Sequence, residues 1–373
     1  MVKNYIWPLG NRISHILMIV FFAGAYITGD EDNLSGYHAA IGITFGFLIL
    51  FRLFWGLIGT KYSKFKDFNF DLLQLKNYML SVFSKKDKYI GHNPASSYAI
   101  VAMLISGLLL IFFGLLAYGV GENHGIFANL HNQYYRYSDY FNEIHEIFVN
   151  IFLAIAIVHV MGSLIDKFIN NNDTIDSMIS GYKYDQNSHG INTNLFQRVY
   201  QIIWIVAAIT IFFYMLIDSS NMFTKSFNKP INYAKESPIY LNECASCHIA
   251  YPPYLLPKIY WKKMMGSLDN HFGEDASLDE KSKLDILDYL IKNSSENSTN
   301  IYGYKIAKSM DTNKTDIAIS ETKFWKAKHK HLDSRVFKSN EVKSKANCVA
   351  CHKQIDNGLL EKDLITIPKV LEI

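Results

Sequence analysis

Cysteine is scarce in this chain. Only four cysteines occur among 373 residues, and all four fall in two copies of one pentapeptide, CASCH at 244–248 and CVACH at 348–352. None is left for a framework of structural disulfide bonds. Net charge is scarce as well: the formal charge is +3, and neither half concentrates the basic residues that a nucleic-acid-binding face requires. Nucleic acid is therefore set aside as a partner.

The mean hydropathy is close to zero because two kinds of sequence average out. Residues 1–217 contain long apolar runs, whereas the remainder is rich in Lys, Asn and Ser. A prior of roughly 100–200 residues per domain predicts two or three units for a chain of this size. The change in composition favours two units that lie in different solvents.

Five stretches come close to the roughly 20 apolar residues that a helix needs to cross a bilayer. They are about Ile13–Thr28, Ala39–Ile58, Tyr98–Tyr118, Ile144–Ile165 and Phe196–Ile217. Because lipid offers no partners to backbone N–H and C=O groups, we expect all five to be helices. A signal peptide is the alternative for the first stretch, since Lys3 and Arg12 precede it, but no small-x-small cleavage site follows before Asp30.

The short loops predict the orientation of these spans. Seven lysines lie between residues 61 and 88, after the second span, whereas the loop after the first span carries Asp30, Glu31 and Asp32. Because positive loops stay on the cytoplasmic side, the N-terminus is predicted to be cytoplasmic. With five spans, the residues after Asp218 then emerge on the opposite face. We therefore expect a multi-pass protein in the lipid of the bacterial inner membrane, with a periplasmic C-terminal domain.

Four histidines fall within the predicted spans, where ionisable groups are costly and usually functional. His15 begins the first span, His38 begins the second from the other side, and the fourth span contains both His145 and His159. A separation of 14 residues in a helix rises about 21 Å, so His145 and His159 lie on one face near opposite membrane surfaces. Topology then pairs His15 with His159 at the cytoplasmic level and His38 with His145 at the outer level. Two facing imidazoles suit a haem iron with both axial positions filled, although each His alone could simply cap or bond a neighbouring helix.

Other polar and small residues of this half are less informative. Arg52 is either a snorkelling anchor at the cytoplasmic interface, which is favoured, or a partner for a haem propionate. Several glycines would let a flat macrocycle approach the backbone, although Gly is common in membrane helices: Gly42, Gly46, Gly107, Gly114 and Gly162. Four further histidines fall in predicted loops and are expected to be solvated surface residues: His92, His124, His131 and His189.

The segments WPLGNRISH, YHAAIGITFGFLILFRLFWGLIG, GHNP and HEIFVNIFLAIAIVHVMGSLIDKF resemble the bacterial cytochrome b561 family, which includes the b-type subunit of nickel–iron hydrogenases. The resemblance covers about residues 5–185. It implies two noncovalent haems b, ligated by the two histidine pairs named above, and exchange of electrons with the quinone pool.

The two pentapeptides predict covalent haem attachment. Two thiols three positions apart reach both vinyl groups of one haem, and the following His reaches its iron. The residues concerned are Cys244, Cys247 and His248 in the first copy and Cys348, Cys351 and His352 in the second. Zinc is the alternative, since paired CxxC ligands also bind zinc. Both copies end in His, however, and the domain is predicted to lie outside the cytoplasm, so we expect two haems c.

Each of these irons needs a second axial ligand or an open position. The candidates are His271, His329 and His331, because the other histidines of this half are already used. The segments YPPYLLPKIYWKKMMGSLDNHF and FWKAKHKHL resemble a family of periplasmic dihaem cytochromes c over about residues 240–360. The resemblance implies bis-His ligation completed by His271 and His329. His331 could replace His329 as the axial ligand if it lies in a loop. Met264 and Met265 are also possible ligands, but they are better interpreted as core residues.

The sequence thus predicts an all-α fold with three parts: a membrane di-haem cytochrome b domain (1–190), a fifth transmembrane helix with a linker (191–238), and a small, mainly helical dihaem cytochrome c domain (239–373). The first part is expected to be a four-helix transmembrane bundle that binds haem. The fifth helix, which contains no His, is expected to tether the exported domain near the outer haem.

The leading functional hypothesis is a membrane-bound electron-transfer protein. It would pass electrons between the quinone pool, or a dehydrogenase or hydrogenase partner, and a soluble periplasmic acceptor or donor. Histidine on both sides of every iron leaves no position for a substrate, so no catalytic residue is assigned. An electron carrier is therefore favoured over a stand-alone enzyme. The protein could also be a quinol:cytochrome c type oxidoreductase or a subunit of one. The alternative is a terminal reductase of small molecules with one labile axial ligand, at His329 or His331. A sensory haem module is least favoured, because no output domain is visible.

Overall fold

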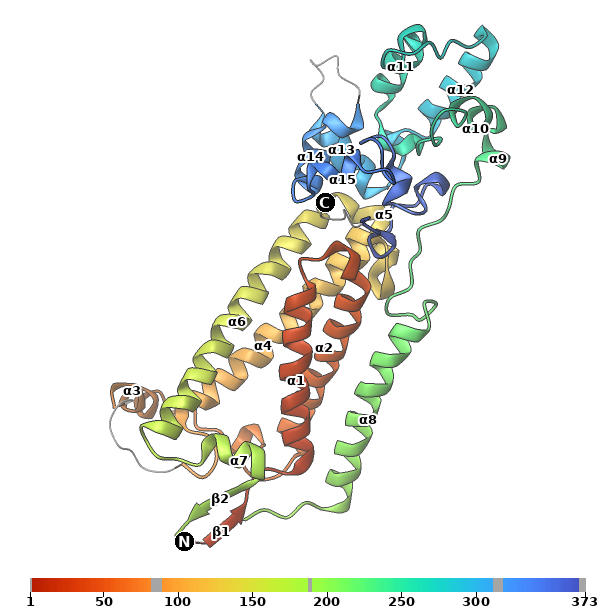
Figure 1. Ribbon diagram of the computed structural model, residues 1–373. Coiled ribbons are helices and arrows are strands. Elements are labelled where there is room, and N and C mark those ends of the chain that lie inside the picture. Colours follow the sequence, from red (N-terminus) through yellow and green to blue (C-terminus); the bar gives the residue numbers. More distant parts are fainter. Residues whose placement is uncertain (1, 82–88, 187–189, 311–317, 369–373) are drawn as a thin grey trace. The chain divides into compact units, whose positions relative to one another are not determined.

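The computed structural model describes every residue except 1, 82–88, 187–189, 311–317 and 369–373. The chain is all-α, as the sequence predicts, apart from one small two-stranded sheet (Figure 1). It divides into two compact units. The first contains residues 1–30, 36–117 and 139–225, and the second contains 31–35, 118–138 and 226–373. Two connections between membrane helices therefore belong to the same unit as the C-terminal part of the chain.

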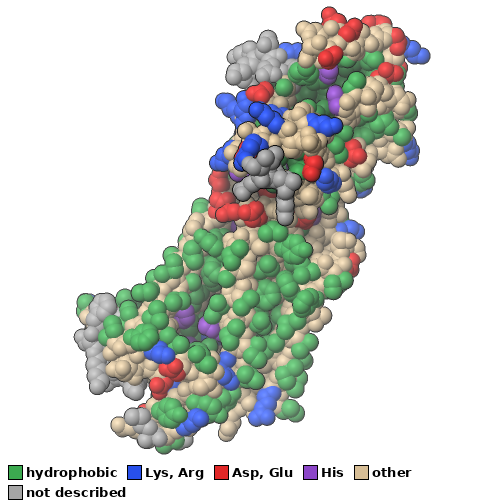
Figure 2. All heavy atoms as spheres, viewed as in Figure 1, with side chains coloured by type: hydrophobic (Ala, Val, Ile, Leu, Met, Phe, Trp, Pro, Cys, Tyr) green, Lys and Arg blue, Asp and Glu red, His purple; other side chains and the backbone are tan. Residues whose placement is uncertain are grey.

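Five helices are long and apolar enough to cross a membrane, which confirms the five predicted spans. Their bounds are α1 Leu9–Thr28, α2 Ser35–Ile58, α4 Pro94–Leu116, α6 Ser138–Phe168 and α8 Leu195–Ile217. Two shorter helices accompany them, α3 Leu72–Leu80 and α7 Thr174–Ser180. Hydrophobic side chains cover most of the visible side of the long helices, as expected for surfaces that face lipid (Figure 2).

Polar caps fix the ends at which two of these helices begin. Asn93 accepts a hydrogen bond from the backbone N–H of Ser96, and Pro94 occupies the first turn of α4, where its missing N–H costs nothing. At the start of α8, Asn194 and Gln197 form a capping box in which each side chain accepts from the other's backbone N–H. The GHNP tetrapeptide is therefore the N-terminal signal of a membrane helix.

The core of the first unit lies between α2, α4 and α6. It contains Phe45 and Ile49 from α2, Leu104 and Leu110 from α4, and Phe152 from α6. Helix α8 belongs to the same unit and packs onto α2 and the residue Gly59 that follows it. The Trp204 ring lies 4.4 Å from that of Phe47, and the Gln197 amide donates to the Gly59 carbonyl at 2.9 Å. The fifth helix is thus held by specific contacts within the first unit.

The sheet pairs β1 Val2–Tyr5 with β2 Tyr182–Asp185 in antiparallel register. Helix α7 ends at Ser180 and is capped by Gly181, whose φ of +88° is accessible to glycine at little cost. The Gly181 carbonyl accepts from the backbone N–H of Ile6 at 2.8 Å, which joins the two strands to the start of α1. Strands of four residues give too weak a sequence pattern to be recognised, and this sheet was not predicted.

The second unit contains short helices around two hydrophobic clusters. Its helices are α5 His131–Tyr134, α9 Tyr233–Glu236, α10 Pro238–Cys244, α11 Lys258–Gly266, α12 Glu280–Lys292, α13 Ile301–Ser309, α14 Lys323–His329 and α15 Ser334–Lys338. The first cluster includes Tyr240, Tyr260, Ile286 and Leu290, and Met265 is buried in it, which agrees with its interpretation as a core residue. The second includes Tyr254, Leu255, Ile306 and Ile355. Each cluster packs against one of the two CxxCH motifs, the first against Cys244 and the second against Cys348.

Candidate haem-binding sites

Helices α1 and α6 bring the first predicted pair of histidines together. The ring centroids of His15 and His159 lie 6.4 Å apart, and the ring planes differ by 63°. Both residues belong to the first unit, and neither side chain is fully exposed. The structure therefore brings together the two residues that were paired from their predicted depth in the membrane.

Helices α2 and α6 bring the second pair together. The ring centroids of His38 and His145 lie 6.1 Å apart, with the planes 88° from parallel. Each ring is held through Nδ1: that of His38 lies 3.0 Å from the Ala25 carbonyl oxygen, and that of His145 lies 3.0 Å from the Leu110 carbonyl oxygen. A carbonyl that holds Nδ1 fixes the ring orientation and presents Nε2 as the ligand atom.

The pair distances match the geometry of axial ligation. A metal–imidazole bond of about 2 Å on each side, with about 1 Å more to each ring centroid, separates the centroids of two axial histidines by roughly 6 Å. The two membrane pairs and the two pairs of the second unit described below all lie between 6.1 and 6.4 Å. The donor set thus fits an iron with imidazole on both faces at four places.

The glycines of the membrane helices divide into two groups. A Cβ at Gly46 would lie 2.8 Å from Ile111, and one at Gly107 would lie 2.5 Å from Ile49, so these two allow close helix packing. Nothing lies within 4 Å of the Cβ position of Gly42 or Gly162, which follow His38 and His159 by about one turn. Space beside a candidate ligand is what a flat macrocycle requires.

Gly114 has a different role, because it makes room for a candidate ligand itself. A Cβ at this position would lie 2.9 Å from the Nδ1 and Cε1 atoms of His145. That is closer than carbon and nitrogen atoms approach without displacement. Only glycine lets α4 and the His145 ring come this near, which also allows the bond from the ring to Leu110.

Arg52 is placed by the loop that follows its own helix. Its Nη1 donates to the Ser63 carbonyl at 3.3 Å, and its guanidinium lies 5.6 Å from the ring centroid of Phe65 and 5.8 Å from that of Phe68. These contacts orient the guanidinium, and the two interpretations of Arg52, an anchor at the interface and a partner for a haem propionate, stay predictions.

The prediction that the loop histidines are solvated is wrong for three of them. His124 is 6% exposed, with its Nε2 3.1 Å from a Glu361 carboxylate oxygen, and His131 is 5% exposed, with its Nδ1 2.7 Å from the Val120 carbonyl oxygen. The His92 ring lies against Trp7 and Phe68, and its buried Nε2 has no hydrogen-bond partner among the described residues. The partners of His124 and His92 are distant in sequence, so no local pattern could reveal them. His189 lies outside the described residues.

The first CxxCH motif faces His271. Cys244 ends α10, and the ring of His248 lies 6.1 Å from that of His271, with the planes within 27° of parallel. His248 Nδ1 lies 2.7 Å from the Ile249 carbonyl oxygen. Burial, and then the neighbouring His248, lower the pKa of His271, which favours the neutral imidazole that binds a metal.

A cavity of about 1080 Å³ adjoins this motif. Its lining includes Leu241, Ala245, Cys247 and His248, and also Val342, Lys343, Ser344, Ala346 and Asn347. Its volume lies slightly above the range of roughly 300–1,000 Å³ typical of ligand pockets. The space beside Cys247 and His248 is therefore sufficient for a cofactor of the size of haem.

The second CxxCH motif faces His329. The backbone N–H of His352 donates to the Cys348 carbonyl at 2.8 Å, which closes a turn across the motif. The rings of His352 and His329 lie 6.2 Å apart. His329 is fixed by a contact of its Nδ1 with the Trp325 carbonyl oxygen at 2.8 Å and by stacking on the Trp325 ring at 4.2 Å. His331, in contrast, is exposed.

The environment of this pair also favours neutral imidazoles. Burial, and then the charge of His329, lower the pKa of His352 to about 4, and burial is the main cause of the lowered pKa of His329. Among the described residues, no group of three or more His, Cys, Asp and Glu side chains is arranged to hold a metal ion. The candidate ligands among the described residues are therefore pairs of imidazoles.

Tyr251 connects the two motifs of the second unit. Its ring lies 5.0 Å from that of His248, and its hydroxyl donates to the carbonyl of Ala346, two residues before Cys348. One aromatic side chain therefore contacts the first motif and the approach to the second.

Comparisons with known proteins follow the same division of the chain. Residues 6–181 match the family model of prokaryotic cytochrome b561, and residues 240–360 match that of dihaem cytochrome c. A probable Ni/Fe-hydrogenase 1 B-type cytochrome subunit from Escherichia coli K12 is 22% identical over 219 residues, which cover 49% of this chain and 91% of the relative. A probable Ni/Fe-hydrogenase B-type cytochrome subunit from Rhodobacter capsulatus is 21% identical over 175 residues, covering 41% and 65%.

Two solved structures of diheme cytochromes c also match part of the chain. The diheme cytochrome c from Rhodobacter sphaeroides is 36% identical and covers 35% of this chain and 99% of its own, with a TM-score of 0.31. A diheme cytochrome c from Shewanella baltica is 30% identical and covers 36% and 94%, with a TM-score of 0.29. On the two family matches, the chain belongs to the prokaryotic cytochrome b561 family over residues 6–181 and to the dihaem cytochrome c family over residues 240–360, and it is a membrane cytochrome of electron transport.

Proposed function

We propose that this protein carries electrons between the membrane and the periplasm through four sites, each with two axial histidines. The observation that carries the proposal is the common spacing of four histidine pairs, 6.1 to 6.4 Å between ring centroids. Two pairs lie in membrane helices, and each of the other two contains the His of a CxxCH motif. Haem bound at these sites would supply one-electron exchange.

The membrane pairs would hold two noncovalent haems b. His15 and His159 would ligate the inner one, and His38 and His145 the outer one. Hydrogen bonds from the Nδ1 atoms of His38 and His145 to the carbonyls of Ala25 and Leu110 support the orientation of the outer pair. The open space beside Gly42 and Gly162 gives room for the ring systems. These residues hold and orient the cofactor, and they exclude other ligands from the iron.

The domain at about 239–373, which we call the c domain, would carry two covalent haems c. Cys244 and Cys247 would bind the first, and Cys348 and Cys351 the second. His248 with His271, and His352 with His329, would supply their axial ligands. The fixed position of His329 and the exposure of His331 support His329 as the ligand.

The proposed electron donor or acceptor on the membrane side is the quinone pool or a dehydrogenase or hydrogenase partner. The relatives from Escherichia coli and Rhodobacter capsulatus are described as hydrogenase B-type cytochrome subunits, which supports such a partner. The distribution of lysines supports a cytoplasmic N-terminus and a periplasmic second domain. A soluble periplasmic protein would then exchange electrons with the c domain.

The closed coordination favours a carrier over a terminal reductase. A reductase needs an axial position that opens to substrate, and the candidates for such a labile ligand are His329 and His331. The His329 ring is restrained at Nδ1 and by stacking on Trp325, and His331 is exposed. This restraint supports electron transfer without a substrate bound to iron.

A cofactor inventory combined with one kinetic measurement tests the proposal. A pyridine haemochrome spectrum of the purified full-length protein should give equal amounts of b-type and c-type haem, and haem staining of the denatured chain should report the covalent part. A quinol analogue should then reduce b-type haem and, after it, c-type haem. If quinol reduced the b haems and never the c haems in protein with full haem content, the proposed path would be wrong.

A further inference from the structure

Two loops between membrane helices fold together with the c domain. Residues 31–35 join α1 to α2, residues 118–138 join α4 to α6, and both segments belong to the second unit. Helices α2 and α6 begin inside that unit, at Ser35 and Ser138. His38 and His145 follow these two starts within about two turns of helix.

Charged contacts hold the first loop. The Asp32 carboxylate lies 3.4 Å from Lys328 Nζ and 3.4 Å from Lys362 Nζ. Ser35 donates through its hydroxyl to the Asp363 carboxylate at 2.9 Å. The loop that precedes His38 is thus bound to residues 328 and 362–363 of the c domain.

The second loop is held by the same C-terminal segment. Lys362 Nζ lies 2.8 Å from the Glu122 carboxylate, and His124 contacts Glu361. The linker after α8 adds backbone contacts, because the N–H of Phe227 donates to the Asn123 carbonyl at 3.0 Å. The His124–Glu361 pair is the buried one, with side chains 8% and 13% exposed, so removing either partner would leave an unpaired buried group. The pairs of Asp32 with Lys328 and Lys362 are more exposed and contribute less.

These contacts reach the second CxxCH motif. Lys328 is adjacent to His329 in sequence, and the segment that contains Glu361 and Lys362 continues to Thr366, whose N–H donates to the Cys351 carbonyl at 2.9 Å. His352 and Ile365 form an isolated bridge in the same segment. One short stretch of chain therefore contacts the two loops and the second motif.

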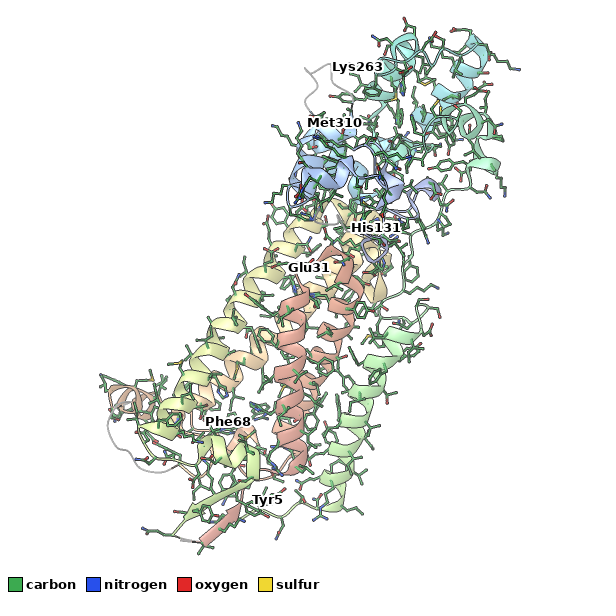
Figure 3. The ribbon with its side chains drawn as sticks, in the orientation of Figure 1. Tyr5, Glu31, Phe68, His131, Lys263 and Met310 are labelled. Carbon is green, nitrogen blue, oxygen red and sulfur yellow. The ribbon has the colours of Figure 1, made fainter. Side chains whose placement is uncertain are left out.

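The first CxxCH motif belongs to the other hydrophobic cluster, with α10, α11 and α12. Within the second unit, Met310 lies between Lys263 of α11 and the loop residues Glu31 and His131 (Figure 3). Cys247 and His248 are exposed. Tyr251 links this motif to the second one, as described above. The cluster that packs against the first motif includes none of the described residues of the two loops.

We infer that the His329–His352 site is the exchange partner of the His38–His145 site, because the two loops that precede His38 and His145 in the chain belong to the same unit as His329 and His352. The His248–His271 site then exchanges electrons with the soluble partner. Every step transfers one electron, oxidising a ferrous site and reducing a ferric one, in either direction. This order of sites rests on the proposed function, whereas the docking of the loops does not.

Disulfide trapping tests the docking without any measurement of electron transfer. The double variant S35C/D363C should form a disulfide in high yield, since the two side chains are in hydrogen-bond contact. The matched control S35C/K263C pairs the same loop residue with exposed Lys263 and should not form one. Proteolysis and mass spectrometry give the yield, and haem staining confirms that the added thiols leave haem attachment intact. Equal yields in both variants would overturn the docking.

Carbon monoxide tests the order of the sites. Each of the variants H329A and H271A has one c site that lacks an axial His and can bind carbon monoxide. After reduction under carbon monoxide this site stays reduced, while the other sites are reoxidised. Quinol is then added, and the spectrum follows reduction of the other c site. We expect this rate to be lower in H329A than in H271A by at least about tenfold. Equal rates, or the reverse ratio, would overturn the order. Absence of c reduction in the parent protein would contradict the proposed function instead, and the trapping result would still decide the docking.

Discussion

The Nε2 atom of His124 lies 3.1 Å from a carboxylate oxygen of Glu361, and both side chains are largely buried, at 8% and 13% exposure. The pair joins a loop between membrane helices to the C-terminal segment of the c domain. Glu361 also accepts hydrogen bonds from Ser226 and Asn228, so the carboxylate is fully engaged. We expect this small cluster to make the stability of the second unit depend on pH.

The stability of the second unit is expected to fall at alkaline and at acid pH. Burial opposes protonation of His124, but its hydrogen bond and charge interaction with Glu361 raise its pKa above 6.5 overall. The stabilisation is complete below 6.5 and is lost as the pH rises through the raised value. Burial raises the pKa of Glu361, but His124 lowers it below 4.5 overall, so this contribution is lost as the pH falls through the lowered value.

The variant His124→Gln checks this pH dependence. It should lower the free energy of unfolding by about 1–3 kcal/mol near pH 6 and remove most of the loss between pH 6 and 9. Thermal melts of the detergent-solubilised protein at several pH values measure both effects. The exposed residue His331 supplies the control, and His331→Gln should keep the parent's pH profile. An unchanged profile in His124→Gln would rule out the pair as its cause.

Loss of one outer axial ligand should remove one haem b. In His145→Ala, the partner of His38 is missing, and a single imidazole holds haem weakly. The ratio of haem b to protein should fall to about half, with the haem c content unchanged. Asn142→Ala, at an exposed position of the same helix, is the matched control. Full haem b in His145→Ala would show that His145 is not a ligand.

A methyl group at Gly114 should disturb the same site. The added Cβ would lie 2.9 Å from the His145 ring, so the ring must move, at a cost of about 1–3 kcal/mol. We expect Gly114→Ala to weaken retention of the outer haem b and to change its redox titration. In Gly24→Ala the nearest atom lies 3.5 Å away, an ordinary contact, so its haem content should match the parent's. Similar losses in both variants would point to a general effect on the helices.

The two histidines of the FWKAKHKHL segment should behave differently. His329→Ala opens an axial position opposite His352, so reduced protein should bind carbon monoxide at one c-type haem. His331→Ala removes an exposed side chain and should leave the reduced spectrum insensitive to carbon monoxide. The difference spectrum with and without carbon monoxide measures this directly. Carbon monoxide binding in His331→Ala alone would reverse the assignment.

Local patterns in the sequence determined much of this protein. Runs of apolar residues located five membrane helices, because a bilayer imposes a minimum length that few other structures need. The fourteen-residue spacing of His145 and His159 follows from helical geometry, so it paired them correctly with His38 and His15. The CxxCH spacing likewise carries its chemistry within five residues. The apolar runs, the histidine spacing and the CxxCH spacing all depend on residues close together in the chain, so they can be recognised in the sequence.

Only the tertiary structure decided which distant residues meet. It placed His329 rather than His331 opposite His352, and it buried His124 against Glu361. It also assigned residues 31–35 and 118–138 to the unit of the c domain. These contacts join segments separated by one hundred residues or more, or depend on the direction of a side chain at the end of a short helix. Neither periodicity nor composition encodes such contacts, because they arise only when the folded chain excludes water between its segments.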